Sequence, residues 1–406
     1  MFRVGVIGGS IAGCSAAILL KRLGAEVVIL ERSEISLQER GAGIVLPETF
    51  VKQCIDLDLF DSSIPRLFVN KRIFLVKDSQ YINYGKEIWQ QNFSVVTLNW
   101  RDVFQNLRKR VSNKDYYSGV EVSGVKQENG VCIIEAKNNQ KYYFDRIIVA
   151  DGITSVLRKQ FFPESSLSYT GYIAWRGVVK STSLIESGLM DKQVFYYGVP
   201  QGHFLIYGIP DIDFQEHGTV LLNWLFYETC SPFSLKELLF DKNGLAHEVS
   251  LPPGSLTECH LNHLHTLVKN HLPIKAANIV YATKQPFIQP IFDLQISCYV
   301  KNTACFIGDS ATLLRPHSAS GVFKALTDSI SLAEIFAESA ANNMQQSLVR
   351  WDINQTKIAS EQSTLAKSMG EALVTHAPDW RWMSHQKMEK WWESVMQNKN
   401  WYATKI

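Results

Sequence analysis

The stretch from Val4 to Gly13 reads Val-Gly-Val-Ile-Gly-Gly-Ser-Ile-Ala-Gly, and it decides the fold of the N-terminal part. Its apolar start predicts a buried strand, and its glycines predict a tight turn with a helix packed close behind it. Glu31 follows Gly13 by eighteen positions and closes a second apolar segment, Glu26 to Leu30. This pattern is typical of a Rossmann βαβ unit, which binds a dinucleotide pyrophosphate at the helix N-terminus and ribose hydroxyls at the acidic residue. Ser10 replaces the middle glycine of the usual motif.

The composition is that of a globular enzyme with a large core. The chain has 406 residues, of which 46% are apolar and 20% charged. A net charge of +2 is too small to indicate a nucleic-acid partner. No apolar run reaches the roughly 18 residues of a membrane span. The seven cysteines show no C-x-x-C pair and the N-terminus has no cationic leader, so we expect a reduced, cytoplasmic protein.

Two kinds of sequence alternate along the chain. The N-terminal third predicts α/β structure, with a helix over 101–112 and strands over 120–125, 131–136 and 146–150. Aromatic and β-branched segments between turn residues then predict an antiparallel sheet, with strands over 172–179, 194–199, 204–209 and 219–227. Residues 232–272 look helical or loop-like. Strand and helix patterns return at 304–307 and from Gly321, and residues 344–406, which contain Trp380, Trp382, Trp391, Trp392 and Trp401, are expected to form helices that pack back onto the body.

Two further motifs place an aspartate directly after an apolar strand. Residues 150–158 read Ala-Asp-Gly-Ile-Thr-Ser-Val-Leu-Arg, and residues 308–311 read Gly-Asp-Ser-Ala. Open α/β sheets bind ligands at these strand ends, where Asp151 and Asp309 can accept hydrogen bonds from sugar-alcohol hydroxyls. A simple nicotinamide-dependent Rossmann enzyme needs neither of them.

In this order, the three motifs resemble those of the FAD-dependent aromatic hydroxylases, the single-component flavoprotein monooxygenases of the p-hydroxybenzoate hydroxylase type. The resemblance covers nearly the whole chain. Longer stretches are similar to one branch, the 2,6-dihydroxypyridine 3-hydroxylase-like enzymes; they are Arg40–Ile44, Gly171–Gly177, Asn223–Trp224, Pro286–Gln289 and Arg315–His317.

The resemblance implies a Rossmann-like FAD-binding domain that is interrupted by an antiparallel substrate-binding sheet domain. The expected boundaries are 1–73, 100–168 and 280–345 for the FAD-binding domain, 74–99 and 169–279 for the sheet domain, and 346–406 for a C-terminal helical region. A homodimer is left open.

A tightly bound, non-covalent FAD is implied, with NADH or NADPH as co-substrate and no metal. Ser10 to Gly13 would touch the pyrophosphate, Glu31 the adenosine ribose and Asp309 the ribityl chain. Asp151 and Arg158 belong to a motif that the family uses for both FAD and the nicotinamide donor. The full set of implied cofactor-binding residues is Gly8, Ser10, Ile11, Ala12, Gly13, Glu31, Arg32, Arg40, Gly41, Ala42, Arg101, Val122, Asp151, Arg158, Asp309, Gly321 and Val322.

The implied reaction is hydroxylation of a small aromatic or N-heteroaromatic ring with NAD(P)H and O2 through a C4a-hydroperoxide of the flavin. Pro316 would lie beside the flavin ring. A base or polarising donor would assist a ring hydroxyl. The candidates for this catalytic part are Pro316, His317, Arg176, Tyr207 and Asn223, with Tyr172 and Tyr227 as further neighbours. His317 is equally compatible with a supporting role in its loop, and Trp175 with a place in the core of the sheet.

Two departures from the family pattern are visible. The family often reads Gly-Asp-Ala-Ala-His where this chain has Thr312 in the last position, and Ser318 replaces a glycine of the usual Pro-x-Gly run. Two alternatives therefore stay open: a flavin-dependent epoxidase or oxidase of a non-aromatic substrate, and a flavin-binding redox-responsive protein without turnover. The cluster Cys259, His260, His263 and His265 fits no zinc spacing. Cys14 is expected to pack against the sheet.

Overall fold

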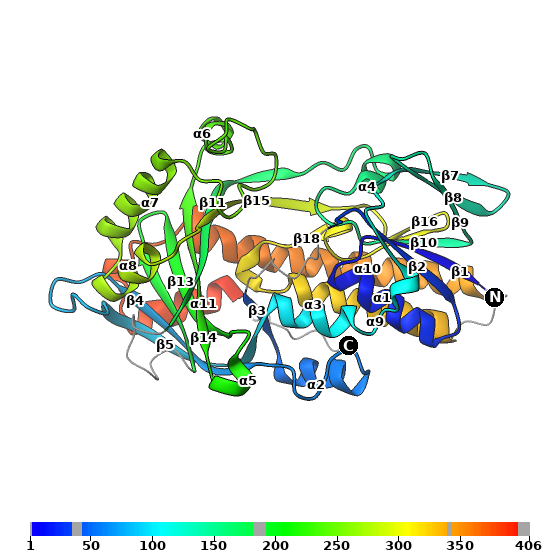
Figure 1. Ribbon diagram of the computed structural model, residues 1–406. Coiled ribbons are helices and arrows are strands. Elements are labelled where there is room, and N and C mark those ends of the chain that lie inside the picture. The colour runs from blue at the N-terminus through cyan, green and yellow to red at the C-terminus, as the bar shows by residue number, and fades with distance from the viewer. Residues whose placement is uncertain (1, 35–42, 182–191, 339–342, 397–406) are drawn as a thin grey trace.

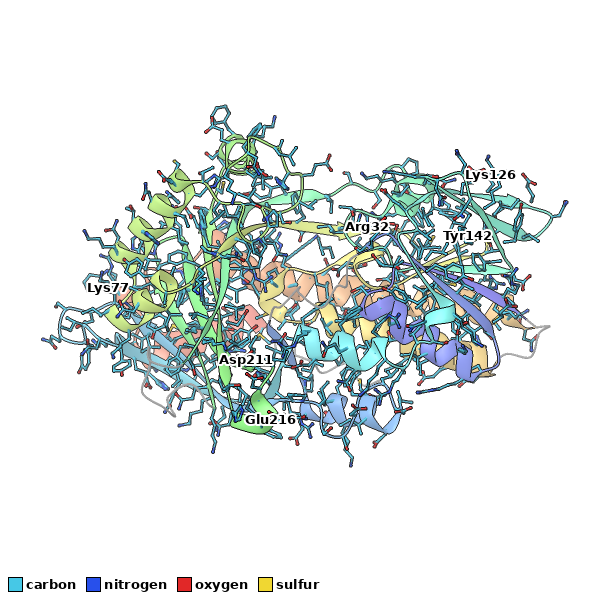
Figure 2. The ribbon with its side chains drawn as sticks, viewed as in Figure 1. Arg32, Lys77, Lys126, Tyr142, Asp211 and Glu216 are labelled. Atoms are coloured by element: carbon cyan, nitrogen blue, oxygen red, sulfur yellow. The ribbon has the colours of Figure 1, made fainter. Side chains whose placement is uncertain are left out.

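The computed structural model describes residues 2–34, 43–181, 192–338 and 343–396. They form two parts that lie side by side, each built on a large sheet (Figure 1). Lys77 marks the far end of one part, and Lys126 and Tyr142 mark a small sheet at the far end of the other (Figure 2). This arrangement confirms the predicted α/β class with a separate sheet domain.

The nucleotide-binding part is built on a sheet that has six strands in the described residues, in the order β16-β17-β10-β1-β2-β6. Its strands are β1 (Arg3–Ile7), β2 (Glu26–Glu31), β6 (Tyr116–Ser118), β10 (Arg146–Val149), β16 (Val300–Lys301) and β17 (Ala304–Phe306). The pairings from β17 to β6 are parallel, and β16 is antiparallel to β17. Parallel strands are covered on both faces, which explains their continuous apolar runs.

Helices and a small sheet surround this parallel sheet. The helices are α1 (Ile11–Arg22), α2 (Glu48–Asp56), α3 (Trp100–Arg108), α4 (Val156–Phe161) and α9 (Gly321–Glu338), with short turns η2 (Asn113–Asp115) and η3 (Gly308–Ser310). The small antiparallel sheet consists of β7 (Val122–Glu128), β8 (Val131–Ala136) and β9 (Lys141–Phe144). α3 ends four residues before the predicted helix 101–112 does, because a turn follows in which the Arg110 and Val111 N–H groups bond to carbonyls only three residues back.

The second part is a sheet with nine strands in the described residues, in the order β18-β15-β11-β14-β13-β12-β4-β5-β3. The strands are β3 (Gly43–Leu46), β4 (Leu67–Val76), β5 (Lys86–Asn99), β11 (Ser168–Lys180), β12 (Gln193–Val199), β13 (Gly202–Pro210), β14 (Val220–Thr229), β15 (Phe287–Gln295) and β18 (Thr312–Leu313). The four predicted segments are antiparallel neighbours as expected, whereas β12 pairs with β4 in parallel. β3 and β15 belong to this sheet, although their residues fall in the ranges 1–73 and 280–345 that we assigned to the FAD-binding domain. The domain boundaries remain a prediction.

Alternate residues of these strands point to two different cores. One face carries Ile173, Trp175 and Trp224; we call it the outer face. It is covered by α6 (Pro232–Leu238), α7 (Glu258–His271) and α8 (Ile274–Tyr281), and α5 (Phe214–His217) lies at the end of the sheet (Figure 1). The opposite face carries Tyr207 and Tyr227; we call it the inner face.

The C-terminal helices pack against the inner face. They are α10 (Met344–Gly370) and α11 (His385–Met396), joined by a π-turn, η5 (Glu371–Thr375), and by η6 (Trp380–Trp382). α10, drawn in orange, contacts elements of both sheets (Figure 1). Trp380 donates through Nε1 to the Val199 carbonyl at 3.1 Å and its ring lies 5.2 Å from that of Trp391. Trp392 is buried as well, as we expected for the tryptophan-rich end. Trp382 is exposed, and Trp401 lies outside the described residues.

Candidate active site

The glycine-rich turn brings α1 close to β1. Gly8 has φ +100°, a conformation that favours glycine, and its N–H donates to the Leu30 carbonyl at 2.9 Å. A Cβ atom on Gly13 would lie 1.8 Å from the Gly8 carbonyl oxygen, so only glycine allows this approach. The Ser10 side chain does not cap the helix. The first N–H groups of α1 are therefore presented at the strand end, as a pyrophosphate site requires.

The Glu31 carboxylate is fixed beside this turn. Its Oε2 accepts from the Gly9 N–H at 2.7 Å and its Oε1 from the Ser33 N–H at 2.9 Å. Each carboxylate oxygen can accept a second hydrogen bond, so the two oxygens remain able to bind a pair of ribose hydroxyls. Val122 is buried in the core at the start of β7, and the Val120 N–H bonds to the Glu31 carbonyl at 2.9 Å.

The three motifs meet at one edge of the parallel sheet. The Ala150 N–H donates to the Ile7 carbonyl at 2.8 Å, and the Ile307 N–H donates to the Val149 carbonyl at 3.0 Å. The strands β1, β10 and β17 therefore end level with one another. Gly8 follows β1 directly, and Asp151 and Gly308 follow β10 and β17 after one further residue, which is where ligands bind in open parallel sheets.

Two aspartates at this edge hold protons more strongly than usual. Asp151 Oδ2 accepts from the Val156 N–H at 3.2 Å, whereas its Oδ1 is buried without a partner in the described residues. Desolvation raises the pKa of Asp151 to about 6. Asp309 is exposed to solvent. Protein atoms around its carboxyl nevertheless displace water and raise its pKa to about 6, although the positive charge of Lys324 acts to lower this pKa.

Arg158 connects the second motif to the third. It is 2% exposed, and it donates to the carbonyls of Gly152 at 3.2 Å, Ile153 at 2.5 Å and Ser310 at 3.3 Å. These contacts place Arg158 in a supporting position beneath the site. A direct contact between Arg158 and a nucleotide remains a prediction. Arg32, in the middle of the molecule (Figure 2), donates to Thr154 Oγ1 at 3.1 Å.

Arg101 supplies a half-buried guanidinium at the start of α3. Its Nε donates to Asp102 Oδ1 at 2.9 Å, but its Nη2 is buried without a partner in the described residues. Such a group is suited to a phosphate or to the edge of a planar anion. Arg40, Gly41 and Ala42 lie outside the described residues. Gly321 begins α9, with Val322 half-buried behind it.

On the inner face, polar side chains lie on neighbouring strands. Arg176 donates through Nη1 to Gln289 Oε1 at 2.5 Å, and its Nε has no partner among the described residues. Asn223 Oδ1 accepts from the Gly43 N–H at 3.2 Å, which leaves its buried Nδ2 equally unpartnered. Tyr207 lies opposite Asn223 in the register of β13 and β14. This face therefore offers N–H donors to an uncharged or anionic oxygen.

The loop η4 (Pro316–Ser318) faces the same side of the sheet and is held by an ion pair. Arg315 donates to both carboxylate oxygens of Asp293, at 2.9 Å from Nε and 2.7 Å from Nη2. His317 Nε2 shares a hydrogen bond of 3.0 Å with the Tyr172 hydroxyl, and its buried Nδ1 has no partner in the described residues. Burial, with His203 and Arg315 nearby, lowers the pKa of His317 far below its usual value. His317 is therefore neutral at pH 7, and it is a weak base.

His203 completes this group, and no local sequence pattern indicates it. Its ring is 4.6 Å from that of Tyr227 and 5.3 Å from that of His317. Its Nδ1 lies 3.3 Å from the Leu373 carbonyl, and burial lowers its pKa to about 3. Asp293 and His203 were missed, and Gln289 was named only within the stretch Pro286–Gln289, because only the strand pairing brings these residues to Arg176 and η4.

A cavity of about 250 Å³ joins the two parts of the site. Ile153 of the second motif lines it, together with Gln289 of the inner face and Pro316 of η4. Phe287 and Leu314 add apolar walls. A mostly apolar cavity with a few polar groups is typical of a site for a small planar molecule.

Other candidate residues lie away from this site. Trp175 is on the outer face, where its Nε1 donates to Glu228 Oε2 at 2.7 Å and its ring is part of the core of the sheet. His263 bonds to the other oxygen of Glu228, also at 2.7 Å, and His260 caps α7. Within the described residues no three potential ligands gather into a metal site. Cys14 is fully buried, as expected.

Comparison with known proteins agrees with this geometry. A pyridine nucleotide-disulphide oxidoreductase model matches residues 2–194, and an FAD binding domain-like model matches residues 169–293. The chain is 30% identical to an FAD-dependent monooxygenase, ntnJ, from Nectria sp, over 83% of this chain and 76% of that protein. It is 26% identical to 2,6-dihydroxypyridine 3-monooxygenase from Paenarthrobacter nicotinovorans, over 91% of each chain.

Solved structures share the fold. The 2,6-dihydroxypyridine-3-hydroxylase of Arthrobacter nicotinovorans superposes with a TM-score of 0.84 at 23% identity, over 95% of this chain and 96% of that one. Klebsiella pneumoniae HpxO, complexed with FAD and uric acid, gives a TM-score of 0.73 at 16% identity, over 98% and 93% of the chains.

The fold and the site define an FAD-binding oxidoreductase. More narrowly, the chain belongs to the FAD-dependent monooxygenases. The unpartnered Arg101 Nη2 and Asp151 Oδ1, and the close approach at Gly13, fit this cofactor. In the part of the chain that the structure describes, no helix combines the length and apolar character needed to cross a bilayer.

Proposed function

We propose that this enzyme hydroxylates a small aromatic or N-heteroaromatic ring with NAD(P)H and O2, and that the ring lies between the inner face and η4. The observation that supports this most is the set of buried nitrogen atoms without partners in the described residues: Arg176 Nε, Asn223 Nδ2 and His317 Nδ1. Leaving such atoms unpaired costs about 1–3 kcal/mol each. A ring with oxygen substituents would satisfy them.

Arg176 and Asn223 would orient the ring and stabilise negative charge on one of its oxygens. Ring hydroxylation is easier when a ring hydroxyl is deprotonated, and a guanidinium lowers the free energy of that anion. The neutral His317 and the buried tyrosines around it would keep the site dry, which prevents wasteful side reactions. The bound FAD would supply the redox chemistry with NAD(P)H and O2.

On the cofactor side, we assign the pyrophosphate to the N-terminus of α1, the adenosine ribose to Glu31 and the ribityl chain to Asp309. Arg101 would hold a phosphate or the flavin edge. The aligned strand ends support this path, because they bring the three motifs together along one sheet edge. NADH or NADPH would bind transiently, and the cavity at Ile153 would leave room for it beside the second motif.

The test is NAD(P)H consumption by the FAD-loaded enzyme with a panel of phenols and hydroxypyridines, with the products identified by mass spectrometry. We expect at least one ring to accelerate the consumption and to appear with one added oxygen. Thr283→Val, on the outer face, should behave as the wild type, whereas Asn223→Leu should raise KM for the ring. An epoxide from a non-aromatic substrate, or no flavin reduction with either nucleotide, would contradict the proposal.

A further inference from the structure

The position at which Thr312 replaces the family's histidine is part of a buried polar network. Thr312 Oγ1 and the Tyr299 hydroxyl share a hydrogen bond of 2.7 Å, and both side chains are fully buried. Thr312 begins β18, directly after the loop that carries Asp309. The hydroxyl pair therefore holds the C-terminal end of that loop.

An ion pair in α9 continues the network. Lys324 Nζ lies 4.9 Å from the centre of the Tyr299 ring, a cation–π distance. Lys324 also forms a salt bridge with Asp328, one helical turn further on. Both residues are no more than 2% exposed. Charges this deeply buried persist only when they are paired and hydrogen-bonded, so the two side chains have defined positions.

Asp328 reaches the other end of the same loop. Its Oδ2 accepts from the Gly308 N–H at 2.9 Å. Gly308 has φ +62°, so the chain turns sharply there just before Asp309. The network thus touches the loop at Gly308 and at Thr312, and Asp309 lies between these two points.

We propose that Tyr299, Thr312, Lys324 and Asp328 are positioning residues for FAD, because they fix the loop Gly308–Thr312 from both ends and so aim Asp309 at the cofactor. This inference rests on the proposed assignment of Asp309 to FAD. Thr312 stands where the family often has a histidine. In this chain the hydrogen bond between the Thr312 and Tyr299 hydroxyls would hold that end of the loop.

The first test uses variants that remove single hydroxyls and keep the ion pair. Apo-protein of Tyr299→Phe and Thr312→Val is titrated with FAD by flavin fluorescence, and the Tm of each apo-protein is measured. We expect the Kd for FAD to rise up to about tenfold, the effect of one net hydrogen bond. The matched control is Thr283→Val, which removes a buried hydroxyl that accepts from Trp224 Nε1 at 2.8 Å on the outer face. Its Kd should not change.

The second test measures whether the hydrogen bond from the Gly308 N–H to residue 328 affects FAD binding when the charges of Lys324 and Asp328 are both removed. Lys324→Met with Asp328→Asn leaves an acceptor for the Gly308 N–H, whereas Lys324→Met with Asp328→Leu leaves none. We expect the Asn variant to bind FAD roughly tenfold more tightly than the Leu variant. Equal affinities for these two, or a Kd in Thr312→Val no higher than in Thr283→Val, would overturn the inference. If instead Asp309→Ala retains FAD, the assignment of Asp309 itself is wrong.

Discussion

The hydroxyl of Tyr172 lies 3.0 Å from Nε2 of His317, and this hydrogen bond ties the inner face of the substrate sheet to the loop that follows the third nucleotide motif. Both side chains are buried, and His203 and Tyr227 pack around the His317 ring. The two parts of the enzyme are therefore coupled at the place where we put the substrate.

Tyr172→Phe should destabilise the protein by about 1–3 kcal/mol, because it leaves His317 Nε2 buried without a partner. The measurement is urea unfolding of the apo-protein. The comparison variant is Tyr169→Phe, whose hydroxyl donates to the Cys230 carbonyl at 2.9 Å at a half-buried site, and it should cost less. A Tyr172→Phe protein as stable as the wild type would show that the bond contributes nothing.

Arg315→Lys should loosen η4, because a lysine cannot make the paired contacts that Arg315 makes with Asp293. We expect a higher KM for the ring and more NAD(P)H consumed per molecule of product, with hydrogen peroxide released. Arg381→Lys alters an exposed pair with Asp379 and should change neither quantity. The ratio of product to NAD(P)H consumed decides between these outcomes.

Acid should destabilise the protein through His203. The pKa of His203 is lowered to about 3 in the folded state, against an unfolded value near 6.5. Between these values the unfolded chain binds more protons, so stability falls as pH falls, by at most about 1.4 kcal/mol per pH unit. His203→Phe removes this dependence. Urea unfolding of both proteins from pH 4 to 7 should show the wild type losing stability relative to the variant as the pH falls.

The titration of Asp309 should have the opposite effect on stability, so that its contribution to the free energy of unfolding falls as the pH rises. Its pKa is raised to about 6 in the folded apo-protein, so the folded state binds more protons between its unfolded value and pH 6. Its contribution to stability is present at low pH and is lost as pH rises through that window. Asp309→Asn should therefore gain stability relative to the wild type on going from pH 4 to 7. A constant difference over this range would contradict the raised pKa.

Cys14 should resist alkylation in the folded enzyme. Burial raises the pKa of its thiol to about 12, and its Sγ contacts the Gly9 carbonyl at 3.1 Å. Cys259 is exposed and provides the internal comparison. Mass spectrometry after brief iodoacetamide treatment should find Cys259 modified and Cys14 intact. Rapid labelling of Cys14 would contradict the burial and the raised pKa of its thiol.

The nucleotide-binding part could be predicted because local sequence carries its geometry. Gly8, Gly13 and Glu31 occupy positions that a turn, a close helix and a strand end demand. The substrate face could be predicted only in part. Alternation along β11 separates Trp175 from Arg176, but only strand pairing shows which face meets η4. A lone histidine such as His203 has no local pattern, because its partners come from β14, η4 and η5.

The central claim is that this chain is an FAD-dependent hydroxylase of an aromatic ring. It is tested most directly by turnover in isotopically labelled O2, with NAD(P)H and a ring that accelerates NAD(P)H consumption. We predict that each hydroxylated ring carries one labelled oxygen atom. A product that carries oxygen from the solvent, or labelled oxygen recovered only as hydrogen peroxide with every ring, would contradict the account.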